Sequence, residues 1–312
     1  MLVAGGASTV DASLFPSDFK VIHDGNFELL GGPVGTPSFC NQHTQARVDK
    51  ATRVLEALGE LPEPQVALKL LRECAAFSKM VFSIRVVPAS YHTEALRLFD
   101  AQVRAAFEQF TCLQPDDEQW AQATLSTNGG GLGLRSLTTH SQAAFLASRS
   151  SCLNLCRELD PAHVFHSSDG SAAAPERLAR EAFNNSVADN ARLPYDITDK
   201  LSQKVLSQAV DDFTAAGLKQ EGATSTARRA HLSLVTAPGA GLWLQATPSK
   251  AAKLDNEPAL FVTMLRRWLR MPFADQDVLC PCCDGVLDCF GDHALVCRCG
   301  GDRARRHNLL RN

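Results

Sequence analysis

A cluster of cysteine and histidine residues near the C-terminus constrains this chain more than any other feature. Six of its eleven cysteines lie between Cys280 and Cys299. Within this stretch, Cys280, Cys283, His293 and Cys297 follow the spacing C-x2-C-x9-H-x3-C. A C-x2-C turn brings two thiolates to one ion, and a histidine and a cysteine on a short helical turn supply the other two tetrahedral corners. The spacing therefore predicts a closed, structural zinc site (Zn²⁺) at these four residues.

The same cluster allows other interpretations. Cys282, Cys289 and Cys299 could replace members of the predicted ligand set, or two of them could form a disulfide in an oxidising compartment. All six thiols could also be free or oxidised, without a metal. We expect zinc, because the sequence shows neither a secretory signal pattern nor an apolar run as long as a membrane span. We therefore expect an intracellular protein, nuclear or cytoplasmic, whose thiols stay reduced.

The residues that follow the cluster are rich in arginine. Guanidinium groups match the geometry of phosphate oxygens, and a metal-bound loop beside them would fix where their charge is presented. The alternative interpretation is a solvated basic tail that binds no phosphate, which is what runs of charge usually are. Because the net charge of the whole chain is −3, a nucleic-acid site must be a local patch. We expect RNA or DNA to be bound by Arg298, Arg303, Arg305, Arg306, His307 and Arg311.

The rest of the chain has the pattern of a mostly α-helical protein. Hydrophobic residues make up 45% of the full sequence, so a large core can form. From Asn41 onward they recur at helical spacing, with prolines and glycines between the segments. Before Asn41, the apolar runs Phe19–Ile22 and Phe27–Leu30 flank an Asp-Gly turn, which predicts a β-hairpin. We expect a mostly α fold with a short mixed N-terminal piece and a small C-terminal zinc knuckle.

Some details of the helical part can be predicted locally. Asp255 is suited to cap the last long helix, and residues 241–244 form a short apolar strand or turn. Arg266, Arg267 and Arg270 lie mostly off the apolar face of that helix and could extend a basic surface toward the knuckle. Five cysteines outside the cluster lie in apolar or helical contexts and are expected to fill the core: Cys40, Cys74, Cys112, Cys152 and Cys156.

The sequence contains no complete active site, so no catalytic residue is assigned. Adjacent acids occur at Asp116-Asp117 and at Asp211-Asp212. The first pair follows a proline and is typical of a helix start, where the dipole favours acids. The second pair lies inside a helical segment, where we expect a solvated face. Two-metal polymerases hold such carboxylates on rigid strands, and neither pair has that context. Nucleophile-elbow and H-E-x-x-H patterns are also absent from the sequence.

Several short phrases stand in a distinctive order along the chain. They are LLGGPVG (29–35), LLREC (70–74), GGGLGLRS (129–136), AAFLAS (143–148), GLWL (241–244), GDHALVC (291–297) and RHN (306–308). Together they resemble the region downstream of the polymerase palm in LINE-type (non-LTR) retrotransposon reverse transcriptases. The resemblance covers nearly the whole chain. It is greatest to members whose CCHC knuckle precedes a restriction-like endonuclease.

The resemblance implies an organisation of the chain. In order, we expect a remnant of the palm edge with a hairpin (1–40), a thumb-like helical domain (41–165), a Ser/Ala/Gly-rich linker (166–175), a helical connecting domain (176–272), and the CCHC knuckle with its basic tail (273–312). The four predicted zinc ligands match the family's knuckle. The family's [FY]-x-D-D polymerase motif would precede Leu29, and residues 1–28 do not contain it. The nuclease carboxylates would follow Asn312.

Two main functions remain open at this point, and a third is an active polymerase whose palm would be encoded in a neighbouring exon or reading frame. The resemblance implies a nucleic-acid-binding fragment related to an RNA-directed DNA polymerase and inactive alone, whose helices would hold a primer–template duplex. A separate chain could then carry the palm or the nuclease. The alternative is a zinc-stabilised helical interaction module, in which the metal only fixes the C-terminal end and the arginines contact protein.

Overall fold

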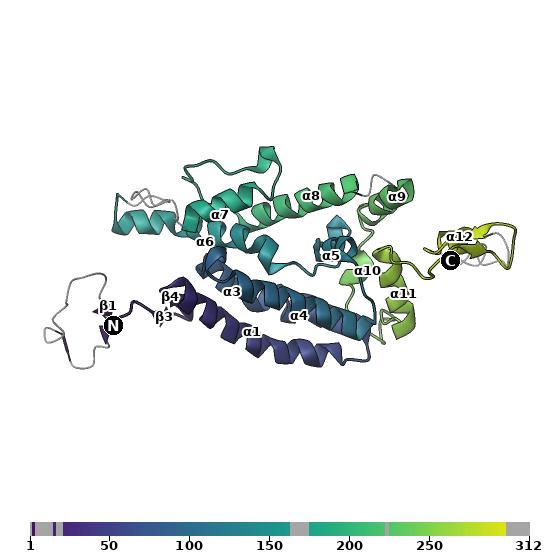
Figure 1. The fold of residues 1–312 in the computed structure, drawn as a ribbon, viewed down its shortest axis with the longest axis horizontal. Helices are drawn as coiled ribbons and strands as arrows, with labels where there is room; N and C mark the ends of the chain where they lie inside the picture. Colours follow the sequence, from purple (N-terminus) through teal and green to yellow (C-terminus); the bar gives the residue numbers. More distant parts are fainter. Residues whose placement is uncertain (1, 4–14, 17–20, 163–174, 222–224, 298–312) are drawn as a thin grey trace.

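The computed structural model describes residues 2–3, 15–16, 21–162, 175–221 and 225–297. In these ranges the chain is mostly α-helical, with three two-stranded sheets. Figure 1 shows the helices as an elongated body, with short strands at the N-terminal end and a small module carrying α12 at the other. The predicted fold class is therefore confirmed, including the mixed N-terminal piece.

The N-terminal strands pair differently from the prediction. They are β1 (Leu2–Val3), β2 (Val21–Ile22), β3 (Phe27–Leu29) and β4 (Gly32–Val34). β1 pairs in parallel with β2, and β3 pairs antiparallel with β4. The hairpin predicted around the Asp-Gly turn is therefore wrong. The tight turn is instead Leu30-Gly31, whose φ angles of 50° and 82° suit a two-residue hairpin connection.

The helices follow in chain order. They are α1 (Pro37–Gly59), α2 (Pro64–Leu70), the π-helix η2 (Leu71–Ala75), α3 (Phe77–Val86), α4 (Thr93–Thr111), α5 (Asp117–Thr124), α6 (Leu137–Leu159), α7 (Pro175–Asn184), α8 (Gln203–Glu221), α9 (Thr226–Val235), α10 (Leu242–Gln245), α11 (Pro258–Trp268) and α12 (Asp292–Val296). Short 3₁₀ turns lie at Ala89–Tyr91, Thr127–Gly129 and Asp189–Ala191.

The helix starts test the local predictions. Asp116 caps α5 in a reciprocal capping box with Gln119, so the first acidic pair is a helix start, as predicted. α11 is capped by Glu257 rather than by Asp255: its carboxylate accepts hydrogen bonds from two amides of the first turn. Residues 242–245 form α10, so the predicted strand or turn is wrong.

The largest hydrophobic cluster joins helices from both halves of the chain. Fully buried Phe99 and Phe107 of α4 belong to the same cluster as Phe261 and Leu265 of α11. A second cluster joins α6, α7 and α8, where Phe183 is fully buried. The predicted domain boundaries are not tested by this packing and stay predictions. The linker 166–175 lies, except for its last residue, outside the described ranges.

The scattered cysteines do not share one environment. Cys40 is buried, as predicted, and burial raises the pKa of its thiol. Cys74, Cys112 and Cys152 are exposed, and Cys156 is half-buried. The prediction that these four fill the core is therefore wrong. A helical context does not fix which side of the helix faces the core, and cysteine is small enough to lie on either.

Asp211 is the largest departure from the sequence-based prediction. Its side chain is 4% exposed instead of solvated, and its carboxylate lies 3.0 Å from Arg135 Nη2 and 3.2 Å from His140 Nε2. Burial opposes ionisation, but these two partners outweigh it and hold the pKa of Asp211 below its usual value. Asp212 is exposed, as predicted. The three-residue network ties α8 to α6 and to the loop before it.

Among the residues that the structure describes, three histidines are buried in the helical body: His92, His140 and His231. Burial lowers the pKa of each, because the charged imidazolium loses hydration. For His92 the pKa falls to about 4. Its Nδ1 lies 2.9 Å from the Thr44 hydroxyl, and its Nε2 is buried without a partner in the described part of the chain.

His92 should make the stability of the protein depend on pH. Its folded pKa of about 4 is lower than the ordinary histidine value of 6.5, so its contribution is complete above pH 6.5 and is lost as the pH falls toward 4. The linked loss for this residue is about 3 kcal/mol at pH 4. Denaturant unfolding of His92→Asn should show a weaker fall in stability from pH 7 to 4. His23→Asn, which alters an exposed histidine, is the control, and equal pH slopes in the two variants would contradict the assignment.

Candidate metal centre

The four predicted zinc ligands come together in the structure. One ligand atom from each of Cys280, Cys283, His293 and Cys297 lies within 4.8 Å of the others. The Cys297 Sγ atom is 3.9 Å from Cys280 Sγ and 3.8 Å from Cys283 Sγ. Zn–S bonds of ~2.3 Å in a tetrahedron place two sulfurs about 3.8 Å apart. His293 Nε2 lies 3.2 Å from Cys283 Sγ. The four residues can therefore hold one metal ion.

A short hairpin and a helical turn build this arrangement. β5 (Val278–Leu279) pairs antiparallel with β6 (Val286–Leu287), and Cys280 follows β5 directly. The Cys280 amide donates to the Gly285 carbonyl at 2.9 Å and closes the turn that carries Cys283. A Cβ atom at Gly285 would lie 2.6 Å from His293 Cε1, so only glycine leaves room for the imidazole ring.

Asp288 fixes the position of His293. Its carboxylate accepts hydrogen bonds from the amides of Phe290 (3.0 Å), Asp292 (3.0 Å) and His293 (2.6 Å) at the start of α12. Burial opposes ionisation here, but these amides outweigh it and hold the pKa of Asp288 below its usual value. The spacing of the metal ligands does not point to this residue. The position of Asp288 shortly before a short helical segment could have identified it in the sequence, because acidic residues there often accept hydrogen bonds from the first helical amides.

The clustered thiols influence one another's ionisation. A backbone hydrogen bond from Cys282 leads a group of contacts that lower the pKa of Cys280 to about 6. At Cys283, the hydrogen bond from the Gly285 amide favours the thiolate, but burial and the thiols of Cys280 and Cys297 outweigh it and raise the pKa to about 11. Without a cation between them, the negative charge of one thiolate therefore disfavours ionisation of the neighbouring thiol.

The knuckle that carries the four Cys/His residues is attached to the helical body through Asp292. Its carboxylate lies 3.2 Å from Arg267 Nη1 and 3.1 Å from Arg270 Nη2. The Arg270 guanidinium also lies over the ring of Phe290, 4.5 Å from the centroid. Arg267 and Arg270 therefore reach the knuckle, where they share one acidic partner. The extension of the basic surface by Arg266, Arg267 and Arg270 stays a prediction.

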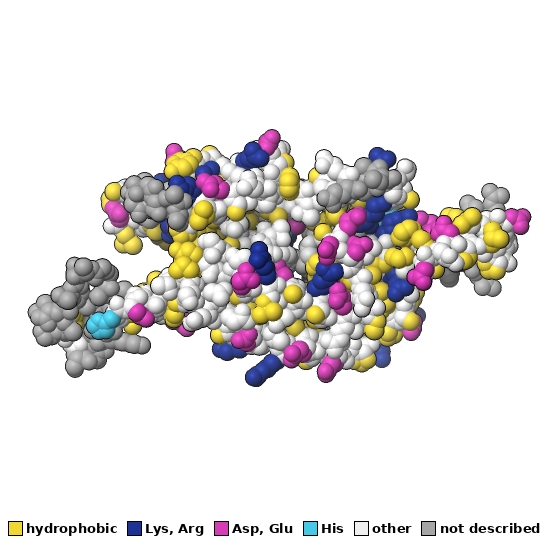
Figure 2. All heavy atoms as spheres, in the orientation of Figure 1, with side chains coloured by type: hydrophobic (Ala, Val, Ile, Leu, Met, Phe, Trp, Pro, Cys, Tyr) yellow, Lys and Arg dark blue, Asp and Glu magenta, His cyan; other side chains and the backbone are white. Residues whose placement is uncertain are grey.

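The described part of the knuckle is acidic. Residues 273–297 contain five aspartates and neither lysine nor arginine. Figure 2 shows acidic side chains over this end of the molecule. By contrast, residues 298–312 contain five arginines and one aspartate. All six predicted nucleic-acid-binding residues, and Cys299, lie outside the described residues, so the structure does not place them.

Cys282 and Cys289 do not belong to the cluster of four ligand atoms. Cys282 is exposed, while the thiol of Cys289 is half-buried and next to Asp277. Burial, reinforced by Asp277, raises the pKa of Cys289, which disfavours the thiolate that a metal needs. Among the described cysteines, the geometry thus favours the ligand set that the spacing predicts.

The comparisons with known proteins give no relative. No protein-family model, curated protein or solved structure matches this chain. None of the helices in the described ranges has the length and apolar character needed to cross a lipid bilayer. The functional interpretation therefore depends on the residues and their geometry.

Proposed function

We propose that this chain is a zinc-stabilised nucleic-acid-binding protein related to the post-palm region of non-LTR retrotransposon reverse transcriptases. The observation that carries the proposal is the four-ligand cluster, which stands directly before an arginine-rich segment. Three thiolates and one imidazole suit a structural zinc ion, and the set leaves no open position for catalysis. The zinc then fixes the point from which the arginines leave the knuckle.

The charge distribution favours the tail as the site of the phosphate contacts. The acidic knuckle would repel a phosphate backbone, and Arg267 and Arg270 are already paired with Asp292. The five arginines after Cys297 supply the positive charge that RNA or DNA requires. In this proposal the knuckle is the anchor, and residues 298–312 make the contacts.

The acidic charge of the knuckle supports one alternative function. An acidic knuckle fits a basic protein partner better than a nucleic acid. The protein would then be a helical interaction module in which zinc only stabilises the C-terminal end. The salt dependence of binding separates the two functions, because phosphate contacts release counterions in proportion to their number.

Replacing Arg305 and Arg306 with alanine should weaken binding to unrelated RNA or DNA sequences about equally. The slope of log affinity against log salt should decrease by roughly one unit for each arginine–phosphate pair that the substitutions remove. Fluorescence anisotropy over a salt series measures both effects. The control variant replaces Arg97 and Arg192 with alanine, because it removes the same charge at two exposed positions in the helical body. An unchanged slope in the Arg305/Arg306 variant would exclude the tail as a nucleic-acid site and leave the zinc site standing.

A further inference from the structure

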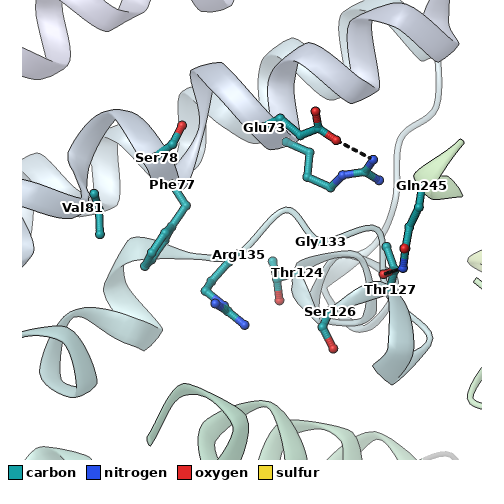
Figure 3. A pocket seen from close by; sticks show the side chains of 11 residues that line it. Glu73, Phe77, Ser78, Val81, Thr124, Ser126, Thr127, Gly133, Arg135 and Gln245 are labelled. Carbon is teal, nitrogen blue, oxygen red and sulfur yellow. Dashed lines mark hydrogen bonds and ion pairs between the residues drawn. The ribbon is translucent and has the colours of Figure 1, made fainter. Parts of the chain in front are cut away.

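A pocket of about 590 Å³ lies in the helical body, away from the metal cluster. Figure 3 shows its walls: Glu73 and Phe77 on one side, Gly133 and Arg135 on the loop before α6, and Thr127 next to Gln245 of α10. Pockets of this size are typical of sites for small organic ligands. Part of the wall belongs to the π-helix η2, and π-helical segments are frequent at functional sites.

Arg72 of η2 is the most distinctive residue of this wall. Its side chain is 12% exposed, and its Nη2 donates a 2.9 Å hydrogen bond to the carbonyl oxygen of Leu244. Its Nη1 is buried and has no partner among the described residues. An unsatisfied donor on a charged group costs free energy, and Arg72 is one of the residues that line the pocket.

The glycine-rich loop is shaped around Arg72. Gly133 has a φ of +76°, and a Cβ atom there would lie 2.7 Å from Arg72 Cδ. Any other residue would be strained and would displace the arginine. The loop and the guanidinium are thus fitted to each other.

The charges around Arg72 leave an excess of positive charge. The Glu73 carboxylate lies 3.5 Å from Arg72, but it is closer to Lys69, at 2.7 Å. One acid therefore stands between two cations, and Lys69 leads the contacts that lower the pKa of Glu73. The second arginine of the wall, Arg135, is neutralised by Asp211. An anionic group is thus favoured at Arg72.

The remaining walls supply a further donor and an apolar side. Thr127 Oγ1 accepts a 2.8 Å hydrogen bond from Gln245 Nε2, which leaves the hydroxyl hydrogen of Thr127 able to donate. Gln245 directly follows Leu244, the residue that Arg72 contacts, so Thr127 and Arg72 border the same region. Phe77 and Val81 line the pocket with apolar surface.

We propose that this pocket binds a phosphate monoester of nucleotide size, with the Arg72 guanidinium and the Thr127 hydroxyl facing the phosphate oxygens. Phosphate offers several acceptor oxygens with negative charge, which is the complement of these donors. The apolar wall of Phe77 and Val81 receives the rest of the ligand. The phosphate belongs either to a free nucleotide or to the 5′ end of a nucleic-acid strand. This site is independent of the zinc knuckle and of its tail.

Calorimetric titration of the full chain with each of the four nucleoside monophosphates tests the proposal. At least one should bind, and the matching nucleoside without phosphate should bind at least about tenfold more weakly. Arg72→Gln should reduce the affinity at least about tenfold, because the charged donor is lost. Ser78→Trp should abolish binding by filling the pocket from an exposed wall position. Arg97→Gln, which alters an exposed residue outside the pocket, should bind as the unaltered protein does.

Two further measurements make the result decisive. Circular dichroism checks that Arg72→Gln remains folded; if it does not, Ser78→Trp alone carries the test. A 5′-phosphorylated oligonucleotide and its 5′-hydroxyl form, titrated in the Arg305→Ala/Arg306→Ala background, separate the two sources of phosphate. Tighter binding of the phosphorylated strand than of the nucleotide assigns the site to strand ends, and equal or weaker binding assigns it to free nucleotides. Failure of all four nucleoside monophosphates to bind, or unchanged affinity in a folded Ser78→Trp protein, would overturn the proposal.

Discussion

The Cys283→Ser protein is expected to lose its zinc, whereas the unaltered protein purified under reducing conditions should carry about one equivalent. Serine keeps the size of the side chain but does not ionise to provide a ligand, and the other three residues form an incomplete tetrahedron. Metal analysis of both proteins measures the effect. The α-helical content should change little, because the large core of α1–α6 and α9–α11 does not include the knuckle.

Cys282→Ser is the matched control for this experiment. Cys282 is the neighbouring residue, carries the same thiol and lies outside the cluster of four. It should keep the full equivalent of zinc. A Cys283→Ser protein that retained its metal would show that the ligands lie elsewhere, among Cys282, Cys289 and Cys299.

The second large effect is expected at Asp211. Asp211→Asn keeps the shape of the side chain but leaves Arg135 without its counter-charge and alters the contact with His140. Removing one partner of a buried ion pair costs about 3–5 kcal/mol, and the lower end applies here because the Arg135 side chain is 31% exposed. Urea unfolding at pH 7 measures the change in the free energy of unfolding.

The adjacent acid provides the control. Asp212→Asn alters an exposed carboxylate one position along α8 and should change stability by less than about 0.5 kcal/mol. Because the folded pKa of Asp211 is lowered, its contribution is complete above the unfolded pKa of about 3.9 and is lost as the pH falls through the folded value. The difference between the two variants in the free energy of unfolding should therefore persist from pH 5 to pH 8. Equal stability of the two would mean that Asp211 acts as an ordinary surface acid.

The sequence predicted the features that depend on local spacing. The fold class follows from the periodicity of apolar residues, and the metal cluster follows from the distances between cysteine and histidine along the chain. The helix start at Asp116 was also predictable, because its capping residues lie within one turn. In each case the interacting groups are close in sequence, so their spacing along the chain is enough to predict which groups meet.

Features that depend on distant partners could not be read in this way. Asp211 is buried because Arg135 and His140, more than 70 residues earlier, meet it across α6 and α8. Arg267 and Arg270 face Asp292 only after the knuckle has folded against α11. A charged residue on a helix has the same local pattern whether its partner is water or another side chain.

The contacts between α2 and the segment before α11 have a consequence for biosynthesis. Gln65 donates to the carbonyl of Leu254 and accepts from the amide of Asn256, across sequence separations of 189 and 191 residues. At translation rates of roughly 5–20 residues per second, about 10–40 s pass between the synthesis of Gln65 and that of its partners. During this interval the surface of α2 that packs against α11 is exposed on the nascent chain. The N-terminal helices must therefore remain soluble on the ribosome before their core is complete.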